Sequence, residues 1–140
     1  MITAIVFFVQ PNTMTSAYLQ QARPFSLYLQ RQLDNQRLNL NLMETWLSRP
    51  LNLDDFANFA PWPTLIENRD EEEMSRQLRI LRRHVVCQIM VRDLCRLAPL
   101  SEVTSSITLF ADFAVNTALV YAENHYEHMY GKPLGAFTGN

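Results

Sequence analysis

Residues 70–97 read DEEEMSRQLRILRRHVVCQIMVRDLCRL, and this stretch decides the fold. It opens with four acidic residues, the sign of charge that a helix N-terminus favours, and Pro99 follows its end. The pattern predicts one helix from about Asn68 to Leu97, with a favourable Glu72–Arg76 pair on its surface. Apolar residues recur along it at helical spacing: Met74, Leu78, Leu81, Val85 and Ile89.

A second long helix is predicted directly downstream, from Ser101 to Tyr130. It ends in the strongest stop signal of the chain, because Gly131 follows its last residue and Pro133 comes two residues later. Two helices of this length with a short turn between them favour an antiparallel pair. The apolar stripe of the second helix comprises Val103, Ile107, Phe110, Ala114, Ala118 and Tyr121.

Shorter helices are predicted upstream of this pair. Ser16 is a suitable N-cap for a first helix, which continues past Pro24 to about Leu33. Leu38–Leu47 forms a second. Asp54 or Asp55 caps a third, which the Pro61-Trp62-Pro63 run ends.

The distribution of glycine supports an all-α fold. All three glycines, Gly131, Gly135 and Gly139, lie in the last ten residues. The preceding 130 residues therefore lack the glycine-rich loops that bring backbone amides close to a phosphate. We expect a helical region over residues 16–130 and a linker over 131–140. Residues 1–15 are expected to be unstructured or a spurious extension, with Met14 as the native start.

Composition excludes some classes of partner. The chain has 140 residues and a formal net charge of −2, which gives no argument for binding nucleic acid or an anionic membrane. The apolar runs at residues 1–9 and 107–122 are each too short to span a bilayer. Cys87 and Cys95 lie about 12 Å apart on one helix, too far for a disulfide, which indicates a reducing compartment.

Residues that bind metals in other proteins are better explained here by helix ends. His125 and His128 lie three residues apart near Glu123, but His84 is the one other histidine in the sequence. Two histidines also interact favourably with a helix C-terminus. The acidic pairs and runs at 54–55 and 70–73 begin helices. We therefore predict no catalytic, cofactor-binding or metal-binding residue.

Arginines are the remaining candidates for contact with a partner. Arg79, Arg82 and Arg83 form a group that could hold a phosphate or the carboxylates of a partner. The alternative is pairing with the acidic first turn and with neighbouring helices. Arg92 and Arg96 are likewise expected away from the apolar stripe.

Several segments resemble one family. Residues 74–119 read MSRQLRILRRHVVCQIMVRDLCRLAPLSEVTSSITLFADFAVNTAL, residues 129–135 read MYGKPLG, and residues 26–34, less specifically, read SLYLQRQLD. In order and spacing they are similar to the N-terminal region of bacterial glutamine synthetase adenylyltransferase, which is also an adenylyl-removing enzyme. The resemblance covers most of residues 16–140.

The resemblance implies a much longer enzyme with two nucleotidyltransferase halves. The N-terminal half removes AMP from glutamine synthetase by phosphorolysis, and the C-terminal half adds AMP from ATP. Each half carries a G-K-x-G-G run and an Asp-x-Asp pair that holds Mg²⁺. These motifs would follow residue 140 in an α/β domain, so no catalytic residue of the family maps onto this sequence. Mg²⁺ and ATP or ADP are implied for the full-length enzyme only.

Two functions follow from these observations. In the first, the chain is a cytoplasmic N-terminal fragment that supports the adenylyl-removing half and is inactive alone. In the second, it is a stand-alone helical module that binds glutamine synthetase or a P-II type signalling protein. In either case the broad apolar faces of the two long helices predict exposed apolar surface, and the isolated chain is expected to self-associate or to be only marginally soluble.

Overall fold

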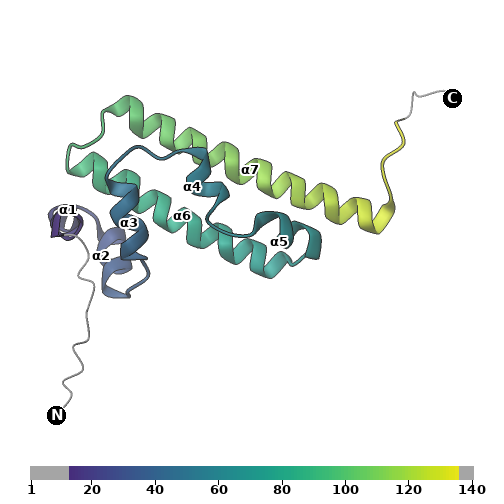
Figure 1. The fold of residues 1–140 in the computed structure, drawn as a ribbon, viewed down its shortest axis with the longest axis horizontal. Coiled ribbons are helices and arrows are strands. Elements are labelled where there is room, and N and C mark those ends of the chain that lie inside the picture. Colours follow the sequence, from purple (N-terminus) through teal and green to yellow (C-terminus); the bar gives the residue numbers. More distant parts are fainter. Residues whose placement is uncertain (1–12, 136–140) are drawn as a thin grey trace, which may run out of the picture. The chain divides into compact units, whose positions relative to one another are not determined.

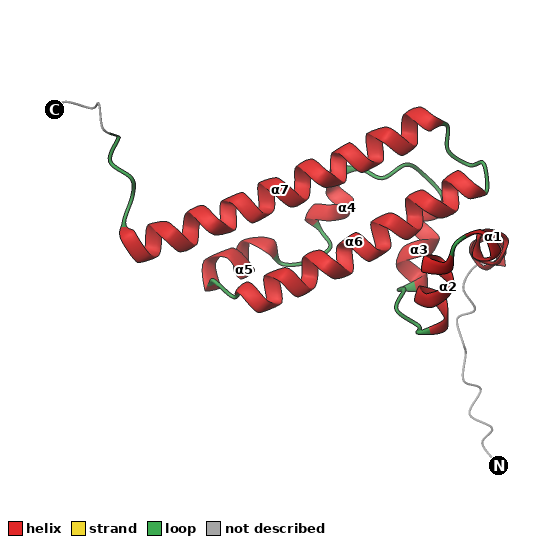
Figure 2. Cartoon of the chain, turned by 180° about the vertical axis from the view of Figure 1, so that it is seen from behind, coloured by secondary structure: helices red, strands yellow, loops and turns green. Residues whose placement is uncertain are grey.

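The computed structural model describes residues 13–135, and all regular structure in that range is helical (Figures 1 and 2). Two long helices, α6 and α7, are joined by a short turn and run antiparallel (Figure 2). The predicted all-α fold with short helices before a long antiparallel pair is confirmed. The elements are α1 (Thr13–Ala22), the 3₁₀-helix η1 (Arg23–Phe25), α2 (Leu27–Asp34), α3 (Leu40–Leu47), α4 (Leu53–Ala57), α5 (Trp62–Asn68), α6 (Glu71–Leu94) and α7 (Leu100–Tyr130).

The first helix begins earlier than predicted. Ser16 lies inside α1 and is therefore not its N-cap, because the helix already begins at Thr13. Pro24 lies in η1, and the true cap of α2 is Ser26, whose Oγ accepts a hydrogen bond from the Leu29 amide at 3.1 Å. Of the predicted N-terminal extension, residues 1–15, the last three are helical and belong to α1. The first twelve lie outside the described residues.

Helix α4 begins at a cap that the sequence reading missed. The Asn52 side chain accepts from the Asp55 amide, and Asp55 accepts in return from the Asn52 amide, so the two form a capping box. Asp55 thus completes the cap, and Asp54 lies in the first turn.

The Pro61-Trp62-Pro63 run begins a helix, contrary to the prediction that it ends one. Pro61 is the N-cap residue of α5, and a proline occupies its first turn, where the missing amide costs nothing. The Trp62 indole Nε1 donates to the Phe56 carbonyl at 2.8 Å. The helix ends at Asn68, followed by Arg69 in the left-handed conformation with φ 53°.

The long helices differ from the prediction at their ends. Asp70 accepts from the Glu73 amide at 3.0 Å, so α6 begins at Glu71 and is shorter than predicted at both ends. Helix α7 begins at Leu100, one residue before the predicted Ser101, and ends at Tyr130, as predicted. Gly131 follows with φ +78°, a conformation that glycine adopts without strain.

The described helices form two compact units, and α6 and α7 each contribute to both. Unit 1 contains the residues up to Leu51 together with His84–Thr104. Its core is apolar and joins α1, α2 and α3 to the second half of α6. The buried members are Leu19, Ala22, Leu29, Leu38, Met43, Leu47, Cys87 and Val91.

Unit 2 contains Asn52–Arg83 and the chain from Ser105 onward. Its core is aromatic: the Phe56 ring lies 5.8 Å from Phe110 and 5.5 Å from Phe113, and Trp62 lies 5.7 Å from Phe113. The Tyr121 hydroxyl donates to the Arg69 carbonyl at 3.1 Å. These contacts attach α4 and α5 to the inner face of α7.

Candidate functional site

The predicted arginine group lies on the first half of α6. Arg79 and Arg82 are exposed and Arg83 is half-buried. Within residues 13–135, none of the three guanidinium groups has a hydrogen bond or ion pair. Their charge stays available to a partner.

The acidic first turn of α6 pairs with a different arginine. Glu73 accepts two hydrogen bonds from Arg76, both at 2.8 Å, and one from the Gln77 amide at 2.7 Å. These bonds, those from Arg76 first, lower the pKa of Glu73 to about 2. The predicted Glu72–Arg76 pair is thus replaced by Glu73–Arg76, at a spacing of three.

Further along α6, three polar residues at a spacing of four are buried. The His84 Nε2 accepts from the Asn39 amide at 2.9 Å, just before α3. The Gln88 amide donates to the carbonyls of Trp46 at 2.9 Å and Arg49 at 3.2 Å. This polar ladder (His84, Gln88, Arg92) holds both ends of α3 within unit 1 by satisfying backbone groups that the helix leaves unpaired.

Arg92 completes the polar ladder, and its predicted place on a non-core face was wrong. Its guanidinium donates to the Glu102 carboxylate at 2.7 and 3.1 Å, and to the carbonyls of Leu47 at 2.8 Å and Leu97 at 3.2 Å. A planar guanidinium can make all four bonds at once. The ladder connects α3, α6 and the first turn of α7 inside unit 1 and is structural.

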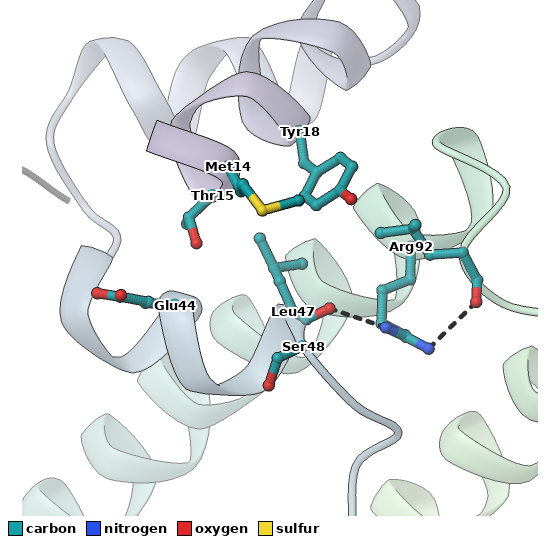
Figure 3. Close-up of a pocket in the computed structure, with 8 residues that line it drawn as sticks. Met14, Thr15, Tyr18, Glu44, Leu47, Ser48 and Arg92 are labelled. Carbon is teal, nitrogen blue, oxygen red and sulfur yellow. Dashed lines mark hydrogen bonds between the residues drawn. The ribbon is translucent and has the colours of Figure 1, made fainter. Parts of the chain in front are cut away.

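A cavity of about 430 Å³ adjoins Arg92 in unit 1 (Figure 3). Figure 3 shows Arg92 bonded to the backbone of Leu47 at its edge, and Arg92 also donates to the Leu97 carbonyl. The Ser48 hydroxyl donates to the Thr45 carbonyl. The polar groups of Arg92 and Ser48 are therefore already engaged in hydrogen bonds to backbone carbonyls. The lining residues are Met14, Thr15, Tyr18, Glu44, Leu47, Ser48, Arg92 and Leu97.

Several of the side chains considered as metal ligands have other contacts. His125 stacks on Tyr121, with ring centroids 6.1 Å apart. Asp55 and Asp70 cap helices. Among residues 13–135, no group of three or more His, Cys, Asp or Glu side chains is placed to hold a metal. Cys87 and Cys95 are both thiols, and burial raises the pKa of Cys95.

The outer face of α7 carries an apolar stripe that sequence analysis did not separate from the inner one. We call this stripe the outer seam. It follows spacings of three and four in alternation, and large apolar side chains on it and at its border are exposed: Val115 by 69%, Ile107 by 53% and Leu119 by 52%. The seam lies within unit 2 and consists of Thr108, Ala111, Val115, Ala118, Ala122 and Met129, bordered by Ile107, Leu119 and Tyr126.

The outer seam leads into a groove at the C-terminal end of α7. The groove has a volume of about 510 Å³, and Leu119, Ala122 and Tyr126 line it together with Gly131–Pro133. The segment after the helix therefore lies along the end of the seam. Tyr126 and Tyr130 stack beside it, with ring centroids 6.2 Å apart.

Of the described helices, α7 is long and apolar enough to cross a membrane by length and composition alone. The apolar run 107–122 is too short to span a bilayer, but the whole helix, Leu100–Tyr130, is long enough. Only a small share of its most apolar part is buried. Because Phe110 and Phe113 pack against α4 and α5, we interpret α7 as a packing helix with one uncovered face.

Comparison with known proteins gives a consistent result. Residues 17–140 match the family model of glutamate-ammonia ligase adenylyltransferase. The bifunctional glutamine synthetase adenylyltransferase/adenylyl-removing enzymes of two Neisseria meningitidis strains, of serogroups A and B, are each 50% identical to the chain over 125 residues. The enzyme of the same name from Chromobacterium violaceum is 38% identical over 125 residues.

The coverage of these matches is unequal. Each includes 89% of this chain but 14% of the relative, so the chain spans about one-seventh of the length of these proteins. No solved structure shows significant similarity to the chain.

Proposed function

Since the chain belongs to the glutamate-ammonia ligase adenylyltransferase family, we propose that it is the N-terminal helical segment of a longer bifunctional enzyme. That enzyme attaches adenylyl groups to glutamine synthetase and removes them. The segment supports the adenylyl-removing half. It packs against the nucleotidyltransferase domain and contributes no reacting group.

The exposed outer seam of α7 carries this proposal. Monomeric soluble proteins rarely leave a long contiguous apolar stripe in water, and such stripes mark surfaces that another protein element covers. The inner face of the same helix is already occupied by the aromatic core of unit 2. The relatives have ample further polypeptide to cover the outer face, because the matched region is 14% of their length.

The polar groups of the chain support a structural role. The polar ladder on α6 is engaged in backbone and ion-pair contacts within unit 1. We therefore assign Mg²⁺, nucleotide and the reacting residues to the rest of the enzyme, in the cytoplasm, and expect the 140-residue chain to be inactive alone.

Complementation tests this function. The Neisseria meningitidis relative is produced without its 125 matched residues and mixed with this chain. Phosphate-dependent release of ADP from adenylylated glutamine synthetase is then measured. We expect each part alone to be inactive or weak and the mixture to recover activity. Turnover by the 140-residue chain alone would contradict the proposal.

A second candidate function rests on the arginine group of α6. Arg79, Arg82 and Arg83 have no partner within the described residues, so they offer a basic surface to carboxylates or phosphates. In this function the chain is a module that binds glutamine synthetase or a P-II type protein. A pull-down with each purified protein tests it. Arg79→Ala with Arg83→Ala should abolish capture, whereas the exposed Arg31→Ala on α2 should not.

A further inference from the structure

We propose that the outer seam of α7 is the docking site for one α-helix of the enzyme's remaining polypeptide. This helix carries large apolar residues at heptad spacing and basic residues along one edge. The inference rests on the proposed function, since it names the surface and the chemistry through which the chain joins the rest of the enzyme.

The spacing of the seam indicates a helical partner. Its members at 108, 111, 115, 118 and 122 alternate spacings of three and four, the 3.5-residue repeat with which two helices pack side by side. A strand or an irregular loop would not match this repeat over about four turns. The seam thus has the periodicity of a helix–helix contact.

The sizes of the seam residues specify the partner's side chains. Ala111, Ala118 and Ala122 are small and leave shallow holes between Ile107, Val115 and Leu119. Knobs that fill such holes are large, and packed pairs combine large with small residues. The partner helix therefore presents leucine, isoleucine or phenylalanine towards the alanines.

Charge favours a basic partner over a second copy of this chain. Helix α7 contains neither lysine nor arginine, and the exposed acids Asp112 and Glu123 border the seam on its polar side. A partner helix with lysine or arginine on that edge gains complementary charge. A second copy of α7 would bring another acidic helix to the same edge.

The path of the chain after α7 agrees with this occupant. Gly131, with φ +78°, turns the backbone at the helix end. Gly131–Pro133 then line the same groove as Leu119, Ala122 and Tyr126. Polypeptide following the helix is thus delivered to the C-terminal end of the seam, and in the relatives the matched region is a small part of a longer chain.

Binding of the truncated Neisseria meningitidis relative to this chain tests the inference. The double variant Val115→Glu, Ala118→Glu places two carboxylates on the seam. The matched double variant Ser105→Glu, Asn116→Glu adds the same charge to the exposed polar side of α7. We expect the seam variant to bind at least 100-fold more weakly, and the polar-side variant to bind within threefold of the unchanged chain.

Thiol protection gives a second measurement that does not depend on weakened binding. The new thiol of the Ala118→Cys variant should react with a maleimide at least tenfold more slowly once the truncated relative is bound. A cysteine at Asn116→Cys should react at an unchanged rate. Circular dichroism of each variant alone checks that α7 remains helical, which we expect because all of these positions are exposed.

The outcomes separate the two proposals. Seam variants that bind as tightly as the unchanged chain would overturn the docking site while leaving the proposed function in place. An unchanged chain that binds only itself, as a dimer disrupted by the seam variant, would overturn the helical partner. An unchanged chain that neither binds nor activates the truncated relative would overturn the proposed function and this inference with it.

Discussion

On α6, the polar residues Gln88 and Arg92 are buried, whereas on α7 the apolar residues Val115 and Leu119 are exposed. The polar pair is buried because its hydrogen-bonding groups meet carbonyls or a carboxylate. The apolar pair is exposed because no element of the described chain covers it. Burial in this protein thus follows the availability of a partner more closely than it follows hydropathy, and the two faces give opposite responses to substitution.

Among substitutions in the polar ladder of α6, loss of Arg92 should lower the free energy of unfolding most. Arg92→Met leaves the half-buried Glu102 carboxylate and two backbone carbonyls without their donor. We expect a loss of about 3–5 kcal/mol in the free energy of unfolding, measured by urea denaturation. Arg82→Met, on the exposed side of the same helix, should change it by less than about 0.5 kcal/mol. Equal effects at the two positions would contradict the polar ladder.

Gln88→Leu should have the next largest effect. The change preserves approximate volume but leaves the Trp46 and Arg49 carbonyls without this donor. An unpaired buried polar group costs about 1–3 kcal/mol, and we expect a loss in that range by thermal unfolding. Gln20→Leu on the exposed face of α1 is the control. A Gln88→Leu variant as stable as the unchanged protein would show that water replaces the amide.

On the apolar side, substitution should hardly change stability but should change association. Val115→Glu with Leu119→Glu removes apolar surface that is already in water, so the free energy of unfolding should change by less than about 0.5 kcal/mol. We expect the unchanged chain to self-associate as its concentration rises and the variant to remain monomeric. Sedimentation velocity measures both, and an unchanged chain that is monomeric at high concentration would contradict the prediction.

The smallest effect concerns an exposed ion pair and appears only in acid. Because the folded-state pKa of Glu73 is lowered to about 2, its contribution is present above the unfolded-state pKa of about 4.5 and is lost as the pH falls towards 2. Glu73→Gln should flatten the dependence of the melting temperature on pH within that window. Glu72 lacks the bonds to Arg76 and Gln77, so Glu72→Gln should leave the pH dependence of the melting temperature unchanged. Identical curves for the two variants would refute the assignment.

Much of the fold could be predicted from the sequence because its signals are local. The acidic start of α6 and the Gly131 stop of α7 require a few neighbouring residues to interpret. The start of α5 was misread because a proline near a helix boundary fits either an end or a first turn. Tertiary contacts distinguish a helix start from a helix end here, because the Trp62 indole donates a hydrogen bond to the Phe56 carbonyl and packs against Phe113.

Side-chain roles on α6 and α7 were harder to predict. The spacing of four between His84, Gln88 and Arg92 places them on one helical face, but a polar face normally indicates solvent. Each of the three bonds at least one backbone group in or beside α3 that lies more than thirty residues away, which no local pattern reveals. The outer seam had a readable 3.5-residue repeat, yet it merged with the inner stripe because α7 is apolar on both sides.

The interleaved units also set an order of events during synthesis. The carbonyls of Trp46 and Leu47 leave the ribosome 42 and 45 residues before Gln88 and Arg92, which bind them. At about 5–20 residues per second, that interval lasts several seconds. Through that time α1, α2 and α3 lack the helix that completes their core, and α4 and α5 then wait in turn for α7. Nascent chains shorter than about 84 residues therefore present both sets of short helices without the parts of α6 and α7 that complete their cores, and chaperones and proteases can act on them.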